Sequence, residues 1–190
     1  MKAIIIITIL VTITQTKMVR RTFGTNDCPA VKLQPNFAAA KYMGTWFEQL
    51  RDKNIKFQDG DCTVAKYNLN ADNSVLVRNS GYNIDTQNFS AIAGKLTFDG
   101  AFGHLKFFPL QPEGKYEVIA TDYENFTVVY SCSTFLFVKS TTAYVLTRQQ
   151  NPPQSIIDKA LKMLQDQDPD YTLDRFRHTI QDESKCKYLD

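Results

Sequence analysis

The sequence predicts an all-β protein, an antiparallel sandwich or barrel of eight strands followed by one helix. Two observations support this fold class. Eight short runs rich in β-branched and aromatic residues follow one another at a spacing of roughly ten residues, with turn-forming residues between most of them. One stretch with helical periodicity comes after the eighth run. The length of 190 residues suits a single domain.

The predicted strands lie between residues 45 and 148. They cover residues 45–51, 62–70, 74–83, 89–98, 104–110, 115–122, 126–133 and 142–148. Turn chemistry separates several of them, as at Asp99-Gly100 and Glu124-Asn125. Eight antiparallel strands can close into a barrel that is just wide enough for one small ligand.

The predicted helix covers residues 152–166 and begins at two prolines, where a backbone N–H is not needed. Asp158 lies near its N-terminal end, as the helix dipole favours. The apolar residues fall on one stripe, which consists of Ile156, Ile157, Ala160, Leu161 and Leu164. We therefore expect the helix to pack against the outside of the sheet. Residues 170–178 are expected to add a short terminal strand.

The N-terminus has the composition of a secretory leader. The apolar run Ala3–Ile13 follows the basic residue Lys2, as in a signal peptide, and is too short to span a bilayer as a helix. We expect residues 1–24 to form a signal peptide and leader, with cleavage after Thr16 or after Gly24. The domain then covers residues 25–190. An uncleaved signal anchor is the alternative.

The charge balance gives no reason to expect a nucleic-acid partner. The formal net charge is +2, and residues 1–24 contain four basic residues and no acidic one. Removing them would leave a net charge of −2, so the remaining domain would be close to neutral.

Four cysteines follow the leader, at Cys28, Cys62, Cys132 and Cys186. An even number behind a signal peptide favours two disulfides, for which three pairings are possible. The chain has no Cys-x-x-Cys motif and only two histidines. We therefore expect no metal site and no cofactor.

Three short motifs occur in order along the chain: Gly44-Thr45-Trp46, Thr121-Asp122-Tyr123 and Arg148. In order and spacing, with the helix after the third, they resemble the motifs of the lipocalin family. The stretches "NDCP", "FQDGDC" and "ATDYENFTVVYSC" are similar to the apolipoprotein D subgroup of that family. The resemblance runs from about Cys28 to Cys186. It implies an eight-stranded up-and-down β-barrel with the helix packed outside.

The resemblance also implies roles for the motif residues and the cysteines. Trp46 is expected inside the closed end of the barrel with Arg148 across its ring, and Gly44 is expected to allow a close backbone approach. Thr121, Asp122 and Tyr123 are expected to form a structural turn. The implied disulfides are Cys28–Cys132 and Cys62–Cys186.

Strand parity and the resemblance together predict a ligand cavity. Side chains two residues apart share a face, which groups Tyr144 with Leu146 and Val77 with Asn79. The resemblance adds Tyr67 as a pocket tyrosine and Asn79 as a polar pocket position. Phe107 or Phe108 is expected to form an aromatic wall. The chain departs from the family in having Tyr144 where a pocket tryptophan is usual, and Glu117 at another aromatic position.

The resemblance implies a secreted, extracellular, non-enzymatic carrier of a small hydrophobic ligand. One alternative is an enzyme that uses a free pocket cysteine, for which Cys62 is the nearest candidate. Another is a protein that contacts lipid or lipoprotein through the loops at the open end, where Phe57 lies. Asn88 and Asn125 begin Asn-x-Ser/Thr sequons beside predicted turns and are candidate glycosylation sites. The sequence does not define an oligomeric state.

Overall fold

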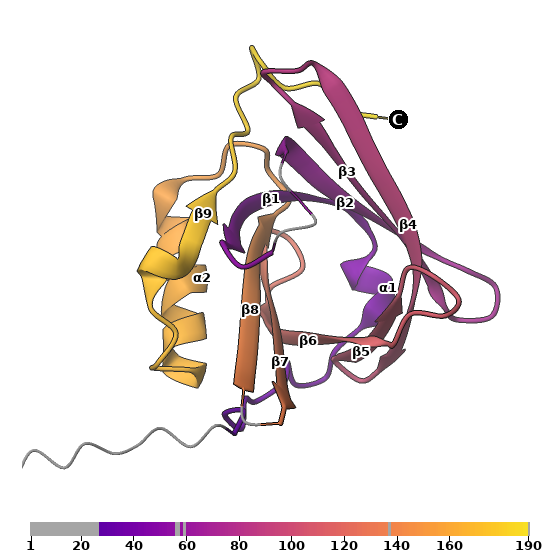
Figure 1. Ribbon diagram of the computed structural model, residues 1–190, viewed down its shortest axis with the longest axis vertical. Helices are drawn as coiled ribbons and strands as arrows, with labels where there is room; N and C mark the ends of the chain where they lie inside the picture. Colours follow the sequence, from indigo (N-terminus) through magenta and orange to yellow (C-terminus); the bar gives the residue numbers. More distant parts are fainter. Residues whose placement is uncertain (1–26, 56–57, 59, 137, 190) are drawn as a thin grey trace, which may run out of the picture.

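The computed structural model describes residues 27–55, 58, 60–136 and 138–189. The leader expected at residues 1–24 and the candidate contact Phe57 lie outside the described residues. Figure 1 shows a ring of strands with helix α2 (Gln154–Gln167) on its outside. A single-turn helix, α1 (Ala39–Tyr42), precedes the first strand. Within the described part of the chain, no helix has both the length and the apolar character to cross a membrane.

Eight strands form the barrel, which confirms the predicted fold class. They are β1 (Gly44–Asp52), β2 (Asp61–Leu69), β3 (Val75–Asn83), β4 (Asn88–Asp99), β5 (Phe102–Lys106), β6 (Gly114–Thr121), β7 (Phe126–Phe135) and β8 (Val138–Thr147). Neighbours in sequence pair antiparallel, and β1 pairs with both β2 and β8, which closes the ring. The terminal strand β9 (Phe176–His178) is shorter than expected and pairs with β1 from Leu50 to Asp52.

The prediction for the fifth strand was wrong at both ends, because β5 covers residues 102–106 and not 104–110. Pro109 has no N–H to donate to a strand ladder and restricts the residue before it, so the strand cannot continue through it. As a result, the long strand β4 pairs with β5 only from Lys95 to Asp99. Among the described residues, no strand pairs with Asn88–Gly94 on that side of β4.

The core has an inner part within the barrel and an outer part beneath α2. The inner cluster includes Trp46 and Leu96, while the outer cluster includes residues of β6, β7 and β8 that pack against the helix. On the predicted helical stripe, Ile157, Ala160 and Leu164 are buried. Burying one large aliphatic side chain contributes about 1.5–3 kcal/mol, so this stripe is sufficient to hold the helix on the barrel.

The two disulfides pair as the resemblance implies. Cys28–Cys132 ties the N-terminal segment to β7, and Cys62–Cys186 ties the C-terminal tail to β2. Their sequence separations are 104 and 124 residues. Loops of this length restrict the unfolded chain by about 4–5 kcal/mol each in the chain-entropy model.

Candidate functional site

The barrel contains a cavity of about 640 Å³. All eight barrel strands contribute residues to its wall, together with the loops before β2 and after β5. The volume lies within the range of about 300–1,000 Å³ that is typical of small-molecule sites. Apolar and aromatic side chains make up much of the wall, so water inside is poorly held and an apolar ligand could displace it.

Six of the seven predicted ligand-binding residues line this cavity: Tyr67, Asn79, Phe107, Phe108, Tyr144 and Leu146. They come from β2, β3, β8 and the segment after β5, so the fold brings together positions far apart in sequence. Strand parity placed Tyr144 and Leu146 on the inward face of their strand, whereas Tyr67 and Asn79 were expected inside from the resemblance. That these side chains contact a ligand stays a prediction.

Val77 is the exception, because it does not line the cavity. It shares a face with Asn79, as parity predicted, but it is fully buried in the inner core with Trp46 and Tyr67. Parity fixes which face a residue occupies and not how far along the barrel it lies. Val77 is two positions from Asn79 on the same face of β3, and this distance along the strand is enough to place it in the packed core and not on the cavity wall.

Phe107 and Phe108 both line the cavity, so the ambiguity between them is resolved in favour of both. Alternation does not apply to them because β5 ends at Lys106. Phe107 lies directly against β4: a Cβ placed on Gly94 would be 2.7 Å from its Cδ1 atom. Gly94 therefore allows the Phe107 ring to close against the strand, and any larger residue there would displace it.

The closed end of the barrel has the geometry that the motifs imply. The guanidinium carbon of Arg148 lies 3.7 Å from the ring centroid of the fully buried Trp46. Arg148 also donates to the backbone oxygen of Thr45 at 2.9 Å and to that of Tyr123 at 3.0 Å. Gly44 has φ +96°, and a Cβ there would lie 3.3 Å from the Arg148 guanidinium. This cation–π contact contributes about 0.5–2 kcal/mol and seals the end of the barrel.

The Thr121-Asp122-Tyr123 turn is held by its own side chains. The Thr121 hydroxyl donates to the Phe126 carbonyl at 2.8 Å. The Asp122 carboxylate accepts the N–H groups of Asn125 and Phe126 at 2.8 and 3.0 Å. Burial alone would raise the pKa of Asp122, but these N–H donors hold it below its ordinary value. The carboxylate therefore stabilises the turn and is not free for acid–base chemistry.

Buried tyrosine hydroxyls form a hydrogen-bonded chain at the cavity wall. Tyr116 bonds to Tyr67 and to Tyr42, each at 2.8 Å between hydroxyl oxygens, and Thr127 donates to Tyr42 at 3.3 Å. Burial raises the pKa of Tyr42 to about 12 and the pKa values of Tyr67 and Tyr116 well above the ordinary value. The hydroxyls are therefore protonated at neutral pH. Tyr67 and Tyr116 present this polar chain to the cavity.

The sequence prediction missed Tyr116 and Tyr42. Alternation on β6 places Tyr116 on the same face as the buried Val118, so a signal for Tyr116 existed. Tyr42 lies in the single turn of α1, before any strand, and a four-residue helix gives no periodicity to read.

Two buried oxygens on the cavity wall have no hydrogen-bond partner among the described residues. They are Thr63 Oγ1 on β2 and Asn79 Oδ1 on β3. A buried polar atom without a partner costs about 1–3 kcal/mol, and most such atoms are paired in folded proteins. Asn79 Oδ1 can only accept, so a hydrogen-bond donor that reaches it would recover this cost.

A buried ion pair on β1, which the sequence prediction also missed, completes the polar part of the wall. Glu48 lines the cavity, and its carboxylate accepts from Arg51 at 2.7 Å and from Gln58 at 2.6 Å. The other Arg51 nitrogen donates to the Gly60 carbonyl at 3.1 Å. Glu48 is two residues from the inward-facing Trp46, so alternation could have placed it inside. Because its charge is satisfied by protein groups, Glu48 shapes the wall and does not compete for a ligand.

The other sequence candidates are distributed outside the cavity. Cys62 is bonded to Cys186 and carries no thiol. Of the two sequons, Asn88 is exposed at the start of β4. Asn125 is half-buried, and its side-chain nitrogen donates to Asp122 at 3.0 Å. Glu117 is half-buried and does not line the cavity, so the usual aromatic is not replaced by a charge inside it.

Comparisons with known proteins agree with this geometry. The chain matches the model of the lipocalin / cytosolic fatty-acid binding protein family over residues 43–183. It is 34% identical to apolipoprotein D of Oryctolagus cuniculus over 142 residues, 72% of this chain and 74% of that protein. It is 26% identical to the Lazarillo protein of Schistocerca americana over 88% of this chain and 79% of that protein. Insecticyanin of the tobacco hornworm Manduca sexta superposes with a TM-score of 0.72 at 22% identity, covering 85% of this chain and 90% of that one.

Proposed function

Since the chain belongs to the lipocalin / cytosolic fatty-acid binding protein family, we propose that it is a secreted carrier of one small hydrophobic molecule. The observation that carries the proposal is a mostly apolar cavity of about 640 Å³ in a barrel that Trp46 and Arg148 close at one end. Such a site works by shielding its ligand from water and requires no bond-making chemistry.

The ligand class follows from the wall. Phe107, Tyr144 and Leu146 offer apolar surface, while Tyr67 and Asn79 offer polar atoms that can orient one end of the ligand. A long-chain alcohol or acid, a sterol or a retinoid fits this pattern. Burying ~350 Å² of apolar ligand surface contributes roughly 9 kcal/mol, from which the cost of association is subtracted. A preformed cavity keeps the ordering part of that cost small, so micromolar or tighter binding is expected.

Carriage is favoured over catalysis because the nearest candidate nucleophile is oxidised. A thiolate is needed for thiol chemistry, and Cys62 is in a disulfide with Cys186. The two disulfides also bear on where the protein is located. Disulfides persist in oxidising compartments, which supports the expected leader at residues 1–24 and an extracellular location. Thiol titration of the folded, unreduced protein should find no reactive group.

The test is native mass spectrometry of the secreted protein, followed by organic extraction and identification of what it carries. A panel of fluorescent fatty acids, sterols and retinoids should then bind the emptied protein. Tyr144→Ala is expected to weaken probe binding about tenfold or more without unfolding the chain, because it removes cavity-wall surface. Phe102→Ala, an aromatic truncation outside the cavity lining, is the control and should leave binding unchanged.

Recovery of no small molecule, together with no binding across the probe panel, would count against a carrier function. Equal losses from Tyr144→Ala and Phe102→Ala would place the binding site elsewhere.

A further inference from the structure

A row of polar groups crosses the cavity wall near the open end of the barrel. Thr63 on β2, Gly81 on β3 and Ser90 on β4 all line the cavity. Gly81 is paired with Ser90, and a Cβ placed on Gly81 would lie 3.3 Å from Thr63 Oγ1 and 3.6 Å from Ser90 Oγ. Because glycine has no side chain, it leaves a recess between the two hydroxyls.

Thr63 is the member of this row that indicates a ligand. Its residue surface is only 4% exposed, and its Oγ1 atom has no hydrogen-bond partner among the described residues. A buried hydroxyl is nearly always hydrogen-bonded in a folded protein. A ligand oxygen that is seated over Gly81 would lie beside the hydroxyls of both Thr63 and Ser90. It would therefore supply the partner that Thr63 lacks.

The row is separate from the polar groups that lie nearer the closed end. Thr63 is four residues from Tyr67 along β2, and Gly81 is two residues from Asn79 along β3. At about 3.3 Å per residue, these positions are about 13 Å and about 7 Å apart. The cavity wall therefore carries polar groups at two levels along the barrel.

A carboxylate beside the row limits the kind of group that fits there. The register that pairs Phe47 with Val64 places Glu48 next to Thr63, and Glu48 and Thr63 both line the cavity. The Glu48 carboxylate forms an ion pair with Arg51 at 2.7 Å. A carboxylate on the ligand would be repelled by this group, whereas a hydroxyl or a carbonyl would not. The recess therefore favours an uncharged oxygen.

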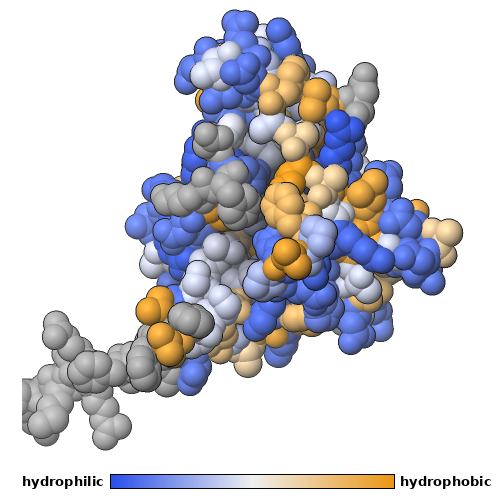
Figure 2. Space-filling model, turned by 45° about the vertical axis from the view of Figure 1, so that its right-hand side comes forward, coloured by the Kyte–Doolittle hydropathy of each residue, from blue (hydrophilic) through white to orange (hydrophobic). Residues whose placement is uncertain are grey.

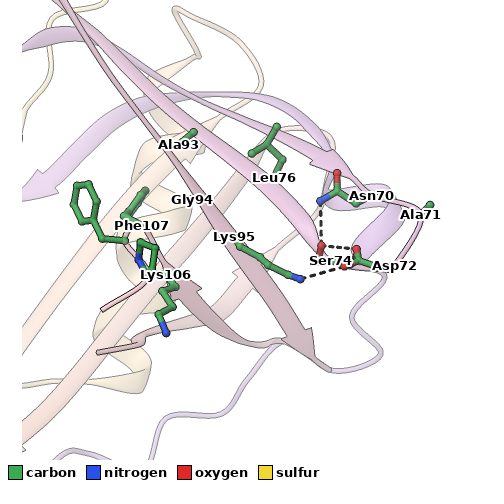
Figure 3. A pocket seen from close by; sticks show the side chains of 12 residues that line it. Asn70, Ala71, Asp72, Ser74, Leu76, Ala93, Gly94, Lys95, Lys106 and Phe107 are labelled. Atoms are coloured by element: carbon green, nitrogen blue, oxygen red, sulfur yellow. Dashed lines mark hydrogen bonds and ion pairs between the residues drawn. The ribbon is translucent and has the colours of Figure 1, made fainter. Parts of the chain in front are cut away.

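The outer surface has no counterpart to this row. Figure 2 shows apolar side chains gathered in a band down the middle of one face of the molecule. Figure 3 shows a hollow of about 680 Å³ on the outside of the barrel, where Asp72 accepts from Lys95 at 3.1 Å and from the Ser74 hydroxyl at 2.5 Å. Both unpaired buried side-chain oxygens of the described residues, on Thr63 and Asn79, line the inner cavity instead.

We propose that the carried molecule has an oxygen at each end, and that the outer one, which is uncharged, occupies the recess over Gly81 between the hydroxyls of Thr63 and Ser90. The inner oxygen lies near Tyr67 and Asn79, and an apolar body of about 7–13 Å separates the two. This inference rests on the proposed carrier function and narrows its ligand class. A fatty acid or alcohol that is polar at one end only leaves the recess unfilled.

Displacement of a bound fluorescent fatty-acid probe by two competitors tests the proposal. The competitors are decanol and the decanediol that has a hydroxyl at each end. Thr63→Val keeps the shape of the side chain and removes the hydroxyl, so it should weaken diol binding about fivefold and leave decanol binding unchanged. Thr97→Val makes the same change at an exposed position of β4 outside the cavity lining, and should affect neither competitor.

Gly81→Ala tests the recess itself. The added methyl group would lie 3.3 Å from Thr63 Oγ1 and would occupy the space for the outer oxygen. Diol binding should again weaken about fivefold, with little change for decanol. Urea unfolding supplies the stability readout. Because Thr63 Oγ1 has no partner, the midpoint of Thr63→Val should equal or exceed that of the wild type.

Equal effects of Thr63→Val on the diol and on decanol would overturn the subsite and leave the carrier function standing. A lower urea midpoint for Thr63→Val would show that its hydroxyl is bonded within the empty protein, which also overturns the subsite. If the probe binds and the diol does not displace it, the subsite is wrong. If no probe binds at all, the carrier function fails, and the subsite fails with it.

Discussion

At the scale of single residues, Asn79 connects the energetics of the empty protein with its choice of ligand. Its buried Oδ1 has no partner among the described residues, so the empty cavity is destabilised by an unmade hydrogen bond. A ligand that donates to this atom recovers that free energy on binding. The unpaired oxygen of Asn79 therefore lowers the stability of the empty protein and raises its affinity for a ligand that donates a hydrogen bond.

Asn79→Leu tests this opposition. The substitution keeps the branching and the number of heavy atoms of the side chain and removes the unpaired acceptor, so the free protein should keep or gain stability, by up to about 1 kcal/mol. Binding of a long-chain alcohol should weaken by roughly five- to tenfold, while binding of its methyl ether, which cannot donate, should change little. Urea unfolding and probe displacement measure the two effects. Equal changes for the alcohol and the ether would contradict the assigned role.

Individual residues also show what the sequence could predict. The contact of Trp46 with Arg148 was predictable, because the motifs that carry it are local and resemble those of a known family. Glu48 and Tyr116 lie on inward-facing positions, but alternation cannot say whether an inward polar group is satisfied. That depends on partners such as Gln58 and Tyr42, which are distant from them or outside any strand.

At the scale of elements, strand positions were predictable and the end of β5 was not. The apolar run of the predicted strand extended through residues 107–110, although Pro109 cannot take part in a strand ladder. The early end of β5 leaves the edge of β4 from Asn88 to Gly94 without a strand partner among the described residues. The prediction therefore failed at the segment in which Phe107 and Phe108 line the cavity.

The β6–β7 turn gives an element-scale prediction about pH. The pKa of Asp122 is lowered in the folded state, so its ionised form stabilises the fold above the ordinary pKa of 3.8. This contribution is lost as the pH falls below about 4 toward the folded pKa. Asp122→Asn should thus be less stable than wild type at pH 7, and the difference should shrink near pH 3.

Urea unfolding midpoints at the two pH values provide the measurement. Asp85→Asn, which changes an exposed acid in a different turn, is the control and should show no such pH-dependent difference. A difference for Asp122→Asn that is the same at pH 7 and pH 3 would argue that the carboxylate charge is unimportant in this turn.

At the scale of the whole molecule, the two disulfides have similar effects on the unfolded chain and different positions in the folded one. Cys28–Cys132 fastens the N-terminal segment to the outer side of the barrel, where both residues belong to the cluster beneath α2. Cys62–Cys186 fastens the C-terminal tail. In that tail, Thr179 donates to the Glu48 carboxylate and Gln181 donates to the Glu48 and Thr63 carbonyls.

Removing each disulfide by paired Cys→Ser substitution should therefore separate stability from binding. The chain-entropy model gives nearly equal losses in the free energy of unfolding, about 4–5 kcal/mol, because loops of 104 and 124 residues differ by only about 0.2 kcal/mol. Loss of Cys62–Cys186 should also weaken cavity-probe binding, since the tail then holds Glu48 and Thr63 less firmly. Loss of Cys28–Cys132 should leave probe affinity unchanged in the fraction that remains folded. Urea unfolding and probe titration of both variants give the comparison, and equal losses of affinity would show that the tail has no specific role in the cavity wall.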